Sequence, residues 1–256
     1  MARILAIETA TEACSVALVD GDTIVARHEL APRRHAELIL PMIEGVLAEA
    51  ALPRSALDAI AVGRGPGAFT GVRLAIAIAQ GLALGLHRPV VPVSTLAALA
   101  LEAHIAFEPL DEAPTAGVTV GGASAPTARP LILAAIDARM GEVYAATFEP
   151  DADDLVTPLD AEVVCPASEL AVPVRDAYLV AGSGWAAYGD ALASRLAQAP
   201  RATYAEMLPR ATSIARLALR ELARGNAVDA AHVRPTYLRD KVALTVAEQA
   251  AARQVR

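Results

Sequence analysis

The chain has 256 residues, of which 55% are hydrophobic and 20% are charged, and its net charge is −7. This length and composition allow a sizeable core in one large domain or two lobes, and they argue against overall disorder. Only Cys14 and Cys165 are present, without a CxxC motif, so neither a disulfide framework nor a zinc cluster is expected. No signal-peptide pattern opens the chain and no apolar run reaches the about 20 residues of a membrane span. We therefore expect a cytoplasmic protein without a membrane contact.

The charge is unevenly distributed. Residues 106–200 carry 4 basic and 14 acidic groups, whereas residues 201–256 carry 10 basic and 5 acidic groups. The acidic middle argues against broad direct nucleic-acid binding. The basic C-terminal part is compatible with a polyanion partner, although a solvated helix face followed by an exposed tail is the interpretation that we favour.

The first elements predict a β-meander followed by a helix. Apolar runs at residues 4–7, 14–19 and 23–30 are separated by turn residues, and Asp20-Gly21-Asp22 is the strongest of these turn signals. Residues 35–50 then predict a helix that is apolar nearly all round. Such a helix must be buried on more than one side.

A glycine-rich turn joins a strand at 59–62 to a helix at 70–86. One interpretation is a phosphate cradle at the helix N-terminus, with Gly65 and Gly67 in contact with the phosphate and Thr70 as the helix cap. The other is a structural turn that starts a helix made almost entirely of small and aliphatic residues. The Gly-Lys-Ser/Thr ending of a P-loop is missing, so we favour the structural turn.

Small residues form two rows on different faces of helix 70–86. The rows are Ala75, Ala79, Ala83 and Ala77, Gly81, Gly85. Small rows let helix backbones approach closely, and this packing would offset the roughly 1 kcal/mol that each glycine costs relative to alanine. One row is expected to pack against other elements of its own lobe. The second row, together with helix 35–50, predicts a helical subunit interface. The residues predicted to form this interface are Leu38, Ile39, Met42, Ile43, Val46, Leu74, Ala77, Ile78, Gly81 and Gly85.

The second half repeats the order of elements of the first half. A strand near 89–93 and a helix that Ser94 caps end the first lobe. Residues 108–129 have no period and many breakers, which is typical of a flexible linker. A strand–turn–strand pattern then returns at 131–148, and a further strand enters a glycine turn before a helix at 186–198. A final amphipathic helix is predicted at 212–224.

These patterns predict two related α/β lobes. The first covers residues 1–107 and the second covers residues 130–256, with the option that helix 212–224 packs back on the first lobe. This order resembles the two-lobed actin-like ATPase fold (ASKHA, ribonuclease H-like), whose members place a nucleotide between the lobes. Here the first hairpin lacks a glycine, and Glu12 adds negative charge, so tight ATP binding is disfavoured. Asp137 in the second hairpin is placed for a metal or water contact, although such residues more often organise their own turn.

No metal or catalytic constellation emerges from the sequence. No two of the five histidines lie closer than seven residues to each other, so the chain has no HxxxH pair. No Gly-x-Ser-x-Gly elbow precedes a helix. We therefore predict no catalytic residue, no metal and no cofactor.

Five segments are similar to the TsaB (YeaZ) family. They are residues 6–18, 35–41, 63–73, 135–144 and 235–240, and the glycine segment and the Asp-Ala-Arg segment are the most specific. The resemblance implies a non-catalytic protein that binds and activates its paralogue TsaD. That complex forms N6-threonylcarbamoyladenosine at position 37 of tRNAs that read ANN codons. Where TsaD has an HxxxH pair, this chain has Thr95 and Leu99.

The resemblance also implies the partners. TsaD forms a heterodimer with the chain, the ATPase TsaE joins the pair, a homodimer forms when TsaD is absent, and tRNA is contacted only through the complex. Two alternatives stay open at this point. One is an enzyme, either an actin-like ATP-dependent phosphotransferase or a glycoprotease-type metalloenzyme, and the other is direct tRNA binding by the basic C-terminal part.

Overall fold

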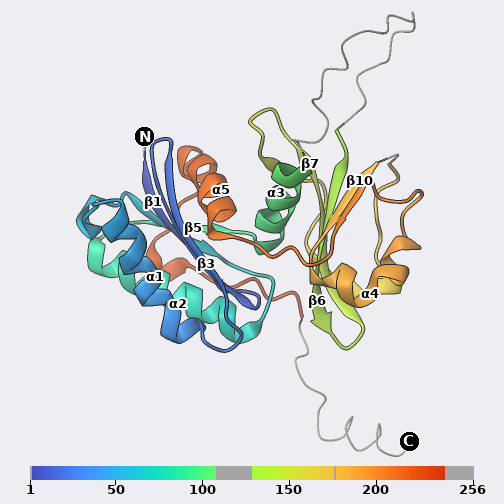
Figure 1. Cartoon of the computed structure of the whole chain (residues 1–256), viewed down its shortest axis with the longest axis horizontal. Helices are drawn as coiled ribbons and strands as arrows, with labels where there is room; N and C mark the ends of the chain where they lie inside the picture. The colour runs from blue at the N-terminus through green and yellow to red at the C-terminus, as the bar shows by residue number, and fades with distance from the viewer. Residues whose placement is uncertain (1, 108–128, 176, 240–256) are drawn as a thin grey trace, which may run out of the picture.

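The computed structural model describes residues 2–107, 129–175 and 177–239. Two β-sheets stand side by side, with helices between them and on their outer faces (Figure 1). The predicted linker at 108–129 falls almost wholly outside the described residues, and so does the tail at 246–256.

The first sheet has the strand order β3-β2-β1-β4-β5. Its strands are β1 (Arg3–Glu8), β2 (Ala13–Asp20), β3 (Thr23–Leu30), β4 (Ala59–Gly63) and β5 (Val90–Val93). The first three strands pair in antiparallel fashion and confirm the predicted meander, whereas β4 and β5 continue the sheet in parallel. Helices α1 (His35–Glu49) and α2 (Phe69–Leu86) share an apolar core with one face of this sheet.

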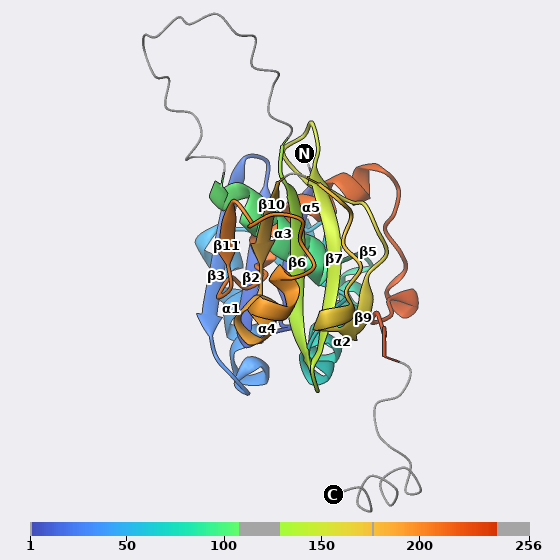
Figure 2. The same cartoon turned by 90° about the vertical axis from the view of Figure 1, so that its right-hand side faces the viewer.

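The second sheet has the order β11-β10-β6-β7-β8, and β9 also pairs with β7. Its strands are β6 (Leu131–Arg139), β7 (Glu142–Pro150), β8 (Val156–Pro158), β9 (Val163–Pro166), β10 (Tyr178–Ala181) and β11 (Ala202–Tyr204). Helix α4 (Ser183–Ala193) covers the outer face of this sheet (Figure 2). As in the first sheet, an antiparallel hairpin is followed by parallel strands. The topology is that of the predicted α/β class with two lobes of one plan.

Two helices lie between the sheets, and each packs against the sheet formed by the other half of the chain. Helix α3 (Thr95–Phe107) packs against β6 and β10 of the second sheet, and α5 (Ala211–Ala223) packs against β1 and β2 of the first. Their buried side chains, such as Leu99 and Leu217, belong to one core that includes residues of both sheets. Each sheet is therefore covered on its inner side by a helix from the other half of the chain, and the two lobes share a core.

Local signals set several helix ends. The Ser94 hydroxyl accepts a hydrogen bond from the backbone N–H of Ala97 at 3.1 Å, so Ser94 caps α3 as predicted. Thr70 does not cap α2, because the helix begins one residue earlier and Ala68 occupies the cap position without a side-chain bond. The helix predicted at 186–198 begins at Ser183, because the glycine turn is one residue long rather than three, and it ends at Ala193.

Short 3-10 helices complete the described chain. They are η1 (Arg54–Ala56), η3 (Ala167–Glu169) and η4 (Ala230–His232). From η4 the chain runs on to Arg239, along the side of α2 and across to the second sheet. This closing segment borders the site described next.

Candidate functional site

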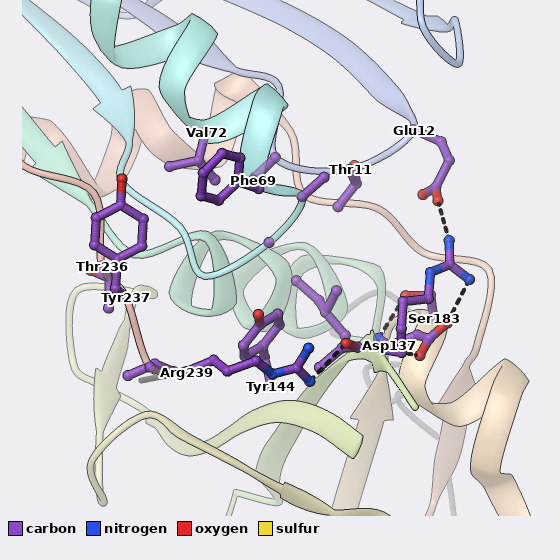
Figure 3. Close-up of a pocket in the computed structure, with 17 residues that line it drawn as sticks. Thr11, Glu12, Phe69, Val72, Asp137, Tyr144, Ser183, Thr236, Tyr237 and Arg239 are labelled. Carbon is purple, nitrogen blue, oxygen red and sulfur yellow. Dashed lines mark hydrogen bonds and ion pairs between the residues drawn. The ribbon is translucent and has the colours of Figure 1, made fainter. Parts of the chain in front are cut away.

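A cavity of about 310 Å³ opens between the two lobes (Figure 3). The first lobe contributes the β1–β2 hairpin and the start of α2, and the second contributes the β6–β7 hairpin with Tyr144 and Ser183. Residues Thr236–Arg239 form a third wall. Of the residues predicted to touch a phosphate, Gly67 and Asp137 line this cavity, whereas Gly65 and Thr70 do not.

Asp137 forms hydrogen bonds within its own hairpin and with α4. Its carboxylate accepts hydrogen bonds from the Arg139 backbone N–H at 2.7 Å, the Arg139 guanidinium at 2.8 Å and the Tyr188 hydroxyl at 3.1 Å. The Arg139 guanidinium also lies 3.8 Å from Glu12 of the first lobe. Asp137 thus organises its turn, the more common role for such a residue, and its arginine partner links the two hairpins across the cavity.

The glycine turn is shaped by close packing against the first hairpin. A Cβ atom at Gly67 would lie 2.5 Å from the backbone oxygen of Ala10, and one at Gly71 would collide with the backbone oxygen of Thr9. The backbone N–H of Ala68, at the start of α2, donates to that same Ala10 oxygen at 2.7 Å. The backbone N–H at the N-cap of α2 is therefore bonded to protein and the glycines allow close packing, a geometry that fits the structural turn.

Glu8 is a buried carboxyl at the end of β1 with an exposed fraction of 1%. Its oxygens accept hydrogen bonds from the Ala10 backbone N–H at 2.6 Å and from the Thr95 hydroxyl at 3.0 Å. Burial without a paired cation raises the pKa of Glu8 to about 7. A Cβ atom at Gly63 would collide with this carboxyl, so Gly63 provides the space for it.

Thr95 and Leu99 are the residues that the family resemblance aligns with the HxxxH pair of TsaD. The Thr95 hydroxyl donates to Glu8, and the side chain of Leu99, one helical turn further on, is fully buried in the apolar core. Among the residues that the structure describes, no group of three or more His, Cys, Asp and Glu side chains is arranged to hold a metal ion. Sequence reasoning did not single out Glu8, because its Thr95 partner is 87 residues away.

Helix α2 exposes a long apolar face. By length and composition alone it could cross a membrane, with a mean hydropathy of 1.6 over 18 residues, contrary to the sequence-based expectation. One side of the helix, the row Ala75, Ala79 and Ala83, is packed in the core of the first lobe. The rest is more accessible, since 33% of the 18-residue window is buried. The remaining surface includes Leu84, which is 61% exposed.

The second small-residue row crosses this exposed face diagonally. Residues at i, i+4 spacing form a ridge on a helix surface, and all members of this ridge are exposed: Phe69, Arg73, Ala77, Gly81 and Gly85. A Cβ atom at Gly81 or Gly85 would meet nothing within 4 Å. We call this ridge, together with Leu84, the α2 face. The predicted residues Leu74 and Ile78 are half-buried beside it.

Three of the five α1 residues predicted for the interface are not available to a partner in this structure. Ile39, Ile43 and Val46 are buried, with exposed fractions of 0%, 2% and 0%, because they pack in the core of their own lobe. A helix that is apolar nearly all round does not reveal which side its sheet covers, and sequence reasoning took the core stripe for a surface.

Leu38 and Met42 are half-buried on one side of α1. They share a helical stripe with Glu49, which pairs with Arg27 of β3, so this stripe faces the β3 edge of the sheet. The opposite side of α1 is turned toward α2, since the strand order runs from β3 to β5. Leu40 lies on that opposite side, is 52% exposed and was missed.

Comparison with known proteins agrees with the fold. A family model described as TsaD, tRNA N6-adenosine threonylcarbamoyltransferase, matches residues 26–246. The chain is 38% identical to the tRNA threonylcarbamoyladenosine biosynthesis protein TsaB of Escherichia coli, over 94% of this chain and 96% of the relative. It is 37% identical to the TsaB protein of Haemophilus influenzae, over 93% and 94% of the two chains.

A solved structure gives the same result. The structure of YeaZ from Pseudomonas aeruginosa superposes with a TM-score of 0.79 at 40% sequence identity, and the match covers 93% of this chain and all of that one (100%). Since relatives in sequence and in structure span nearly the whole chain, it belongs to the TsaB (YeaZ) family of TsaD-like proteins.

Proposed function

We propose that this chain is the non-catalytic subunit that binds and activates TsaD. The reaction served is formation of N6-threonylcarbamoyladenosine at position 37 of tRNAs that read ANN codons, with TsaE as a third component. The curated relatives are named for biosynthesis of this nucleoside, which supports the pathway. The observation that carries the proposal for the binding step is the exposed ridge of small residues on α2.

The two glycines of the α2 face need an explanation outside the monomer. A glycine in a helix interior costs about 1 kcal/mol relative to alanine. Because a Cβ atom at Gly81 or Gly85 would touch nothing within 4 Å, no packing inside the described chain offsets that cost. A partner helix that approaches the backbone closely at these positions would offset it. The apolar exposed surface around Leu84 and Leu40 supports the same proposal, because such patches mark protein contacts.

The non-catalytic assignment rests on side-chain identity at the interlobe site. Thr95 and Leu99 stand where the resemblance places metal-binding histidines, and neither provides an imidazole ligand. The Glu8 carboxyl is bonded to Thr95, and the Asp137 carboxylate is bonded to Arg139 and Tyr188. The Glu8 and Asp137 carboxyls thus form hydrogen bonds that hold the fold together.

The primary occupant of the α2 face in this proposal is TsaD, and a second copy of the chain replaces it when TsaD is absent. A subunit that works on tRNA through TsaD also belongs in the cytoplasm. Membrane insertion of α2 would require removing the Ala75–Ala79–Ala83 row from its core, which makes a protein partner the better explanation.

Direct tRNA binding is expected to be weak. Of the arginines in the basic C-terminal part, several already pair with acids: Arg210 with Glu102, Arg220 with Asp151, Arg224 with Glu221 and Arg239 with Glu142. These ion pairs partly neutralise the basic surface, so we expect few counterions to be replaced along a phosphate backbone by the paired arginines. A steep fall of tRNA affinity of the isolated chain with salt concentration would contradict this expectation.

The test of the binding step adds bulk to the α2 face. Gly81→Leu and Ala77→Leu are expected to abolish the heterodimer with purified TsaD in size-exclusion chromatography, because the added side chains separate the helices. The matched control is Ala187→Leu, which adds the same kind of bulk to an exposed position of α4 in the other lobe. The monomers should keep their fold by circular dichroism, and an unchanged heterodimer with both α2 variants would overturn the proposal.

A further inference from the structure

Arg73 stands in an aromatic stack at the N-terminal end of the α2 face. Its guanidinium carbon lies 3.2 Å from the ring centroid of Phe69 and 5.0 Å from that of Tyr237. The two ring centroids are 6.4 Å apart. Phe69 is 56% exposed and Tyr237 is 55% exposed, so the stack lies at the surface. Figure 3 shows the two rings on the α2 side of the interlobe cavity.

The stack orients Arg73 without using its hydrogen-bond donors. A guanidinium carries five N–H donors in its plane, and stacking on aromatic rings leaves them free. Within residues 2–107, 129–175 and 177–239, Arg73 makes neither a hydrogen bond nor an ion pair. An arginine fixed in this way has lost part of its side-chain freedom before any partner arrives, which lowers the entropic cost of binding.

The closing segment of the chain places Tyr237 in the stack. The backbone N–H of Thr236 donates to the Arg64 carbonyl at 2.8 Å, and the Arg239 guanidinium donates to the Ala138 carbonyl at 3.0 Å. The segment is thereby attached to both lobes on either side of Tyr237. The stack is therefore built from two distant parts of the chain and is not a chance contact within one helix.

The location of Arg73 indicates which kind of ligand it serves. Arg73 precedes Ala77 by one helical turn on the same exposed ridge, whereas it does not line the interlobe cavity. The cavity has two arginines of its own, Arg139 and Arg239, beside the acids Glu12 and Asp137. The donors of Arg73 thus belong to the α2 face.

We propose that Arg73, held by Phe69 and Tyr237, binds a carboxylate of the protein partner that docks on the α2 face. A guanidinium fork matches a carboxylate with two parallel hydrogen bonds, and arginine is one of the residues that contribute most at protein interfaces. The inference rests on the proposed function and adds to it a charged contact at one end of the small-residue ridge. It also gives the C-terminal segment a role in partner recognition.

The experiment measures the affinity of the full chain for purified TsaD by calorimetry. Arg73→Ala is expected to raise Kd about tenfold or more, because a charge-assisted contact is lost. Arg73→Lys keeps the charge but loses the planar fork, so it should recover little of the affinity. Tyr237→Phe should bind like the wild type, whereas Tyr237→Ala should weaken binding. The matched control, Arg216→Ala, removes an exposed arginine of α5 on the other face of the first sheet and should have no effect.

Gly81→Leu is measured in the same series to separate the two proposals. If Gly81→Leu abolishes binding while Arg73→Ala binds like the wild type, the inference about Arg73 is wrong and the docking face stands. If neither variant changes Kd, the proposed function fails as well. If Arg73→Ala leaves the heterodimer intact but weakens binding of ATP or inorganic phosphate to the chain, Arg73 serves a small anion and the inference is overturned.

Discussion

The Thr95 hydroxyl donates a hydrogen bond to the buried Glu8 carboxyl across 3.0 Å, and this contact joins the end of β1 to the start of α3. Because α3 packs on the second sheet, the pair connects the two lobes at the bottom of their junction. The residues around the pair are arranged to accommodate it, since Gly63 leaves the space that the carboxyl fills. The Glu8–Thr95 contact is thus part of the packing that joins the two lobes.

Glu8 should make the protein less stable as the pH rises. Its pKa is raised from 4.5 to about 7 in the folded state, so between these values the folded state binds more protons than the unfolded state. The free energy of unfolding then falls with increasing pH over this window, by an amount on the order of 1–3 kcal/mol. Glu8→Gln, a neutral isostere of the protonated acid, should flatten this dependence in urea unfolding between pH 4.5 and 7.

The control for this experiment is Glu206→Gln, which neutralises an exposed acid on the second lobe and should leave the pH dependence unchanged. Equal slopes for the wild type and Glu8→Gln would show that Glu8 does not titrate differently in the two states.

Gly81→Ala should stabilise the monomer and weaken its association. The added methyl group meets nothing within 4 Å, so the gain in helix propensity, about 0.5–1 kcal/mol, appears in the free energy of unfolding. The same methyl group holds a partner helix further away and should raise the Kd of the heterodimer. Urea unfolding at a concentration where the chain is monomeric, together with calorimetry against TsaD, measures the two effects.

Gly63→Ala is the matched contrast for Gly81→Ala. Its Cβ atom collides with the Glu8 carboxyl, so the same chemical change should destabilise the protein by about 1–3 kcal/mol. If Gly81→Ala lost stability as Gly63→Ala does, the α2 face would be packed against the chain itself.

The isolated chain should not bind ATP and Mg²⁺ with micromolar affinity. The first hairpin, which lacks a glycine, packs closely against the glycine turn, and the Asp137 carboxylate is paired with Arg139, so this arrangement disfavours phosphate and metal contacts in both lobes. Calorimetry with ATP and Mg²⁺ is expected to give no binding heat at micromolar concentrations. Micromolar binding accompanied by turnover would favour the actin-like phosphotransferase alternative.

Local patterns determined much of the fold. The meander of β1 to β3, the Ser94 cap and the small-residue rows of α2 were predicted from periodicity and turn chemistry, and the structure confirms them. These features depend on interactions between residues that are close in sequence, and a single chain displays them directly. The repeated order of elements likewise predicted two lobes of one plan.

Tertiary structure decided which apolar and polar side chains are available. Ile39, Ile43 and Val46 look equivalent to surface residues in an all-round apolar helix, and only the position of the sheet makes them core. The Glu8–Thr95 bond and the Arg73–Tyr237 stack join segments that are far apart in the chain, and their spacing has no sequence signature. The sequence by itself therefore determined the two lobes and the apolar, small-residue helix α2. Long-range packing decided which side of α2 is exposed to solvent and placed Arg73 between Phe69 and Tyr237 at one end of that side.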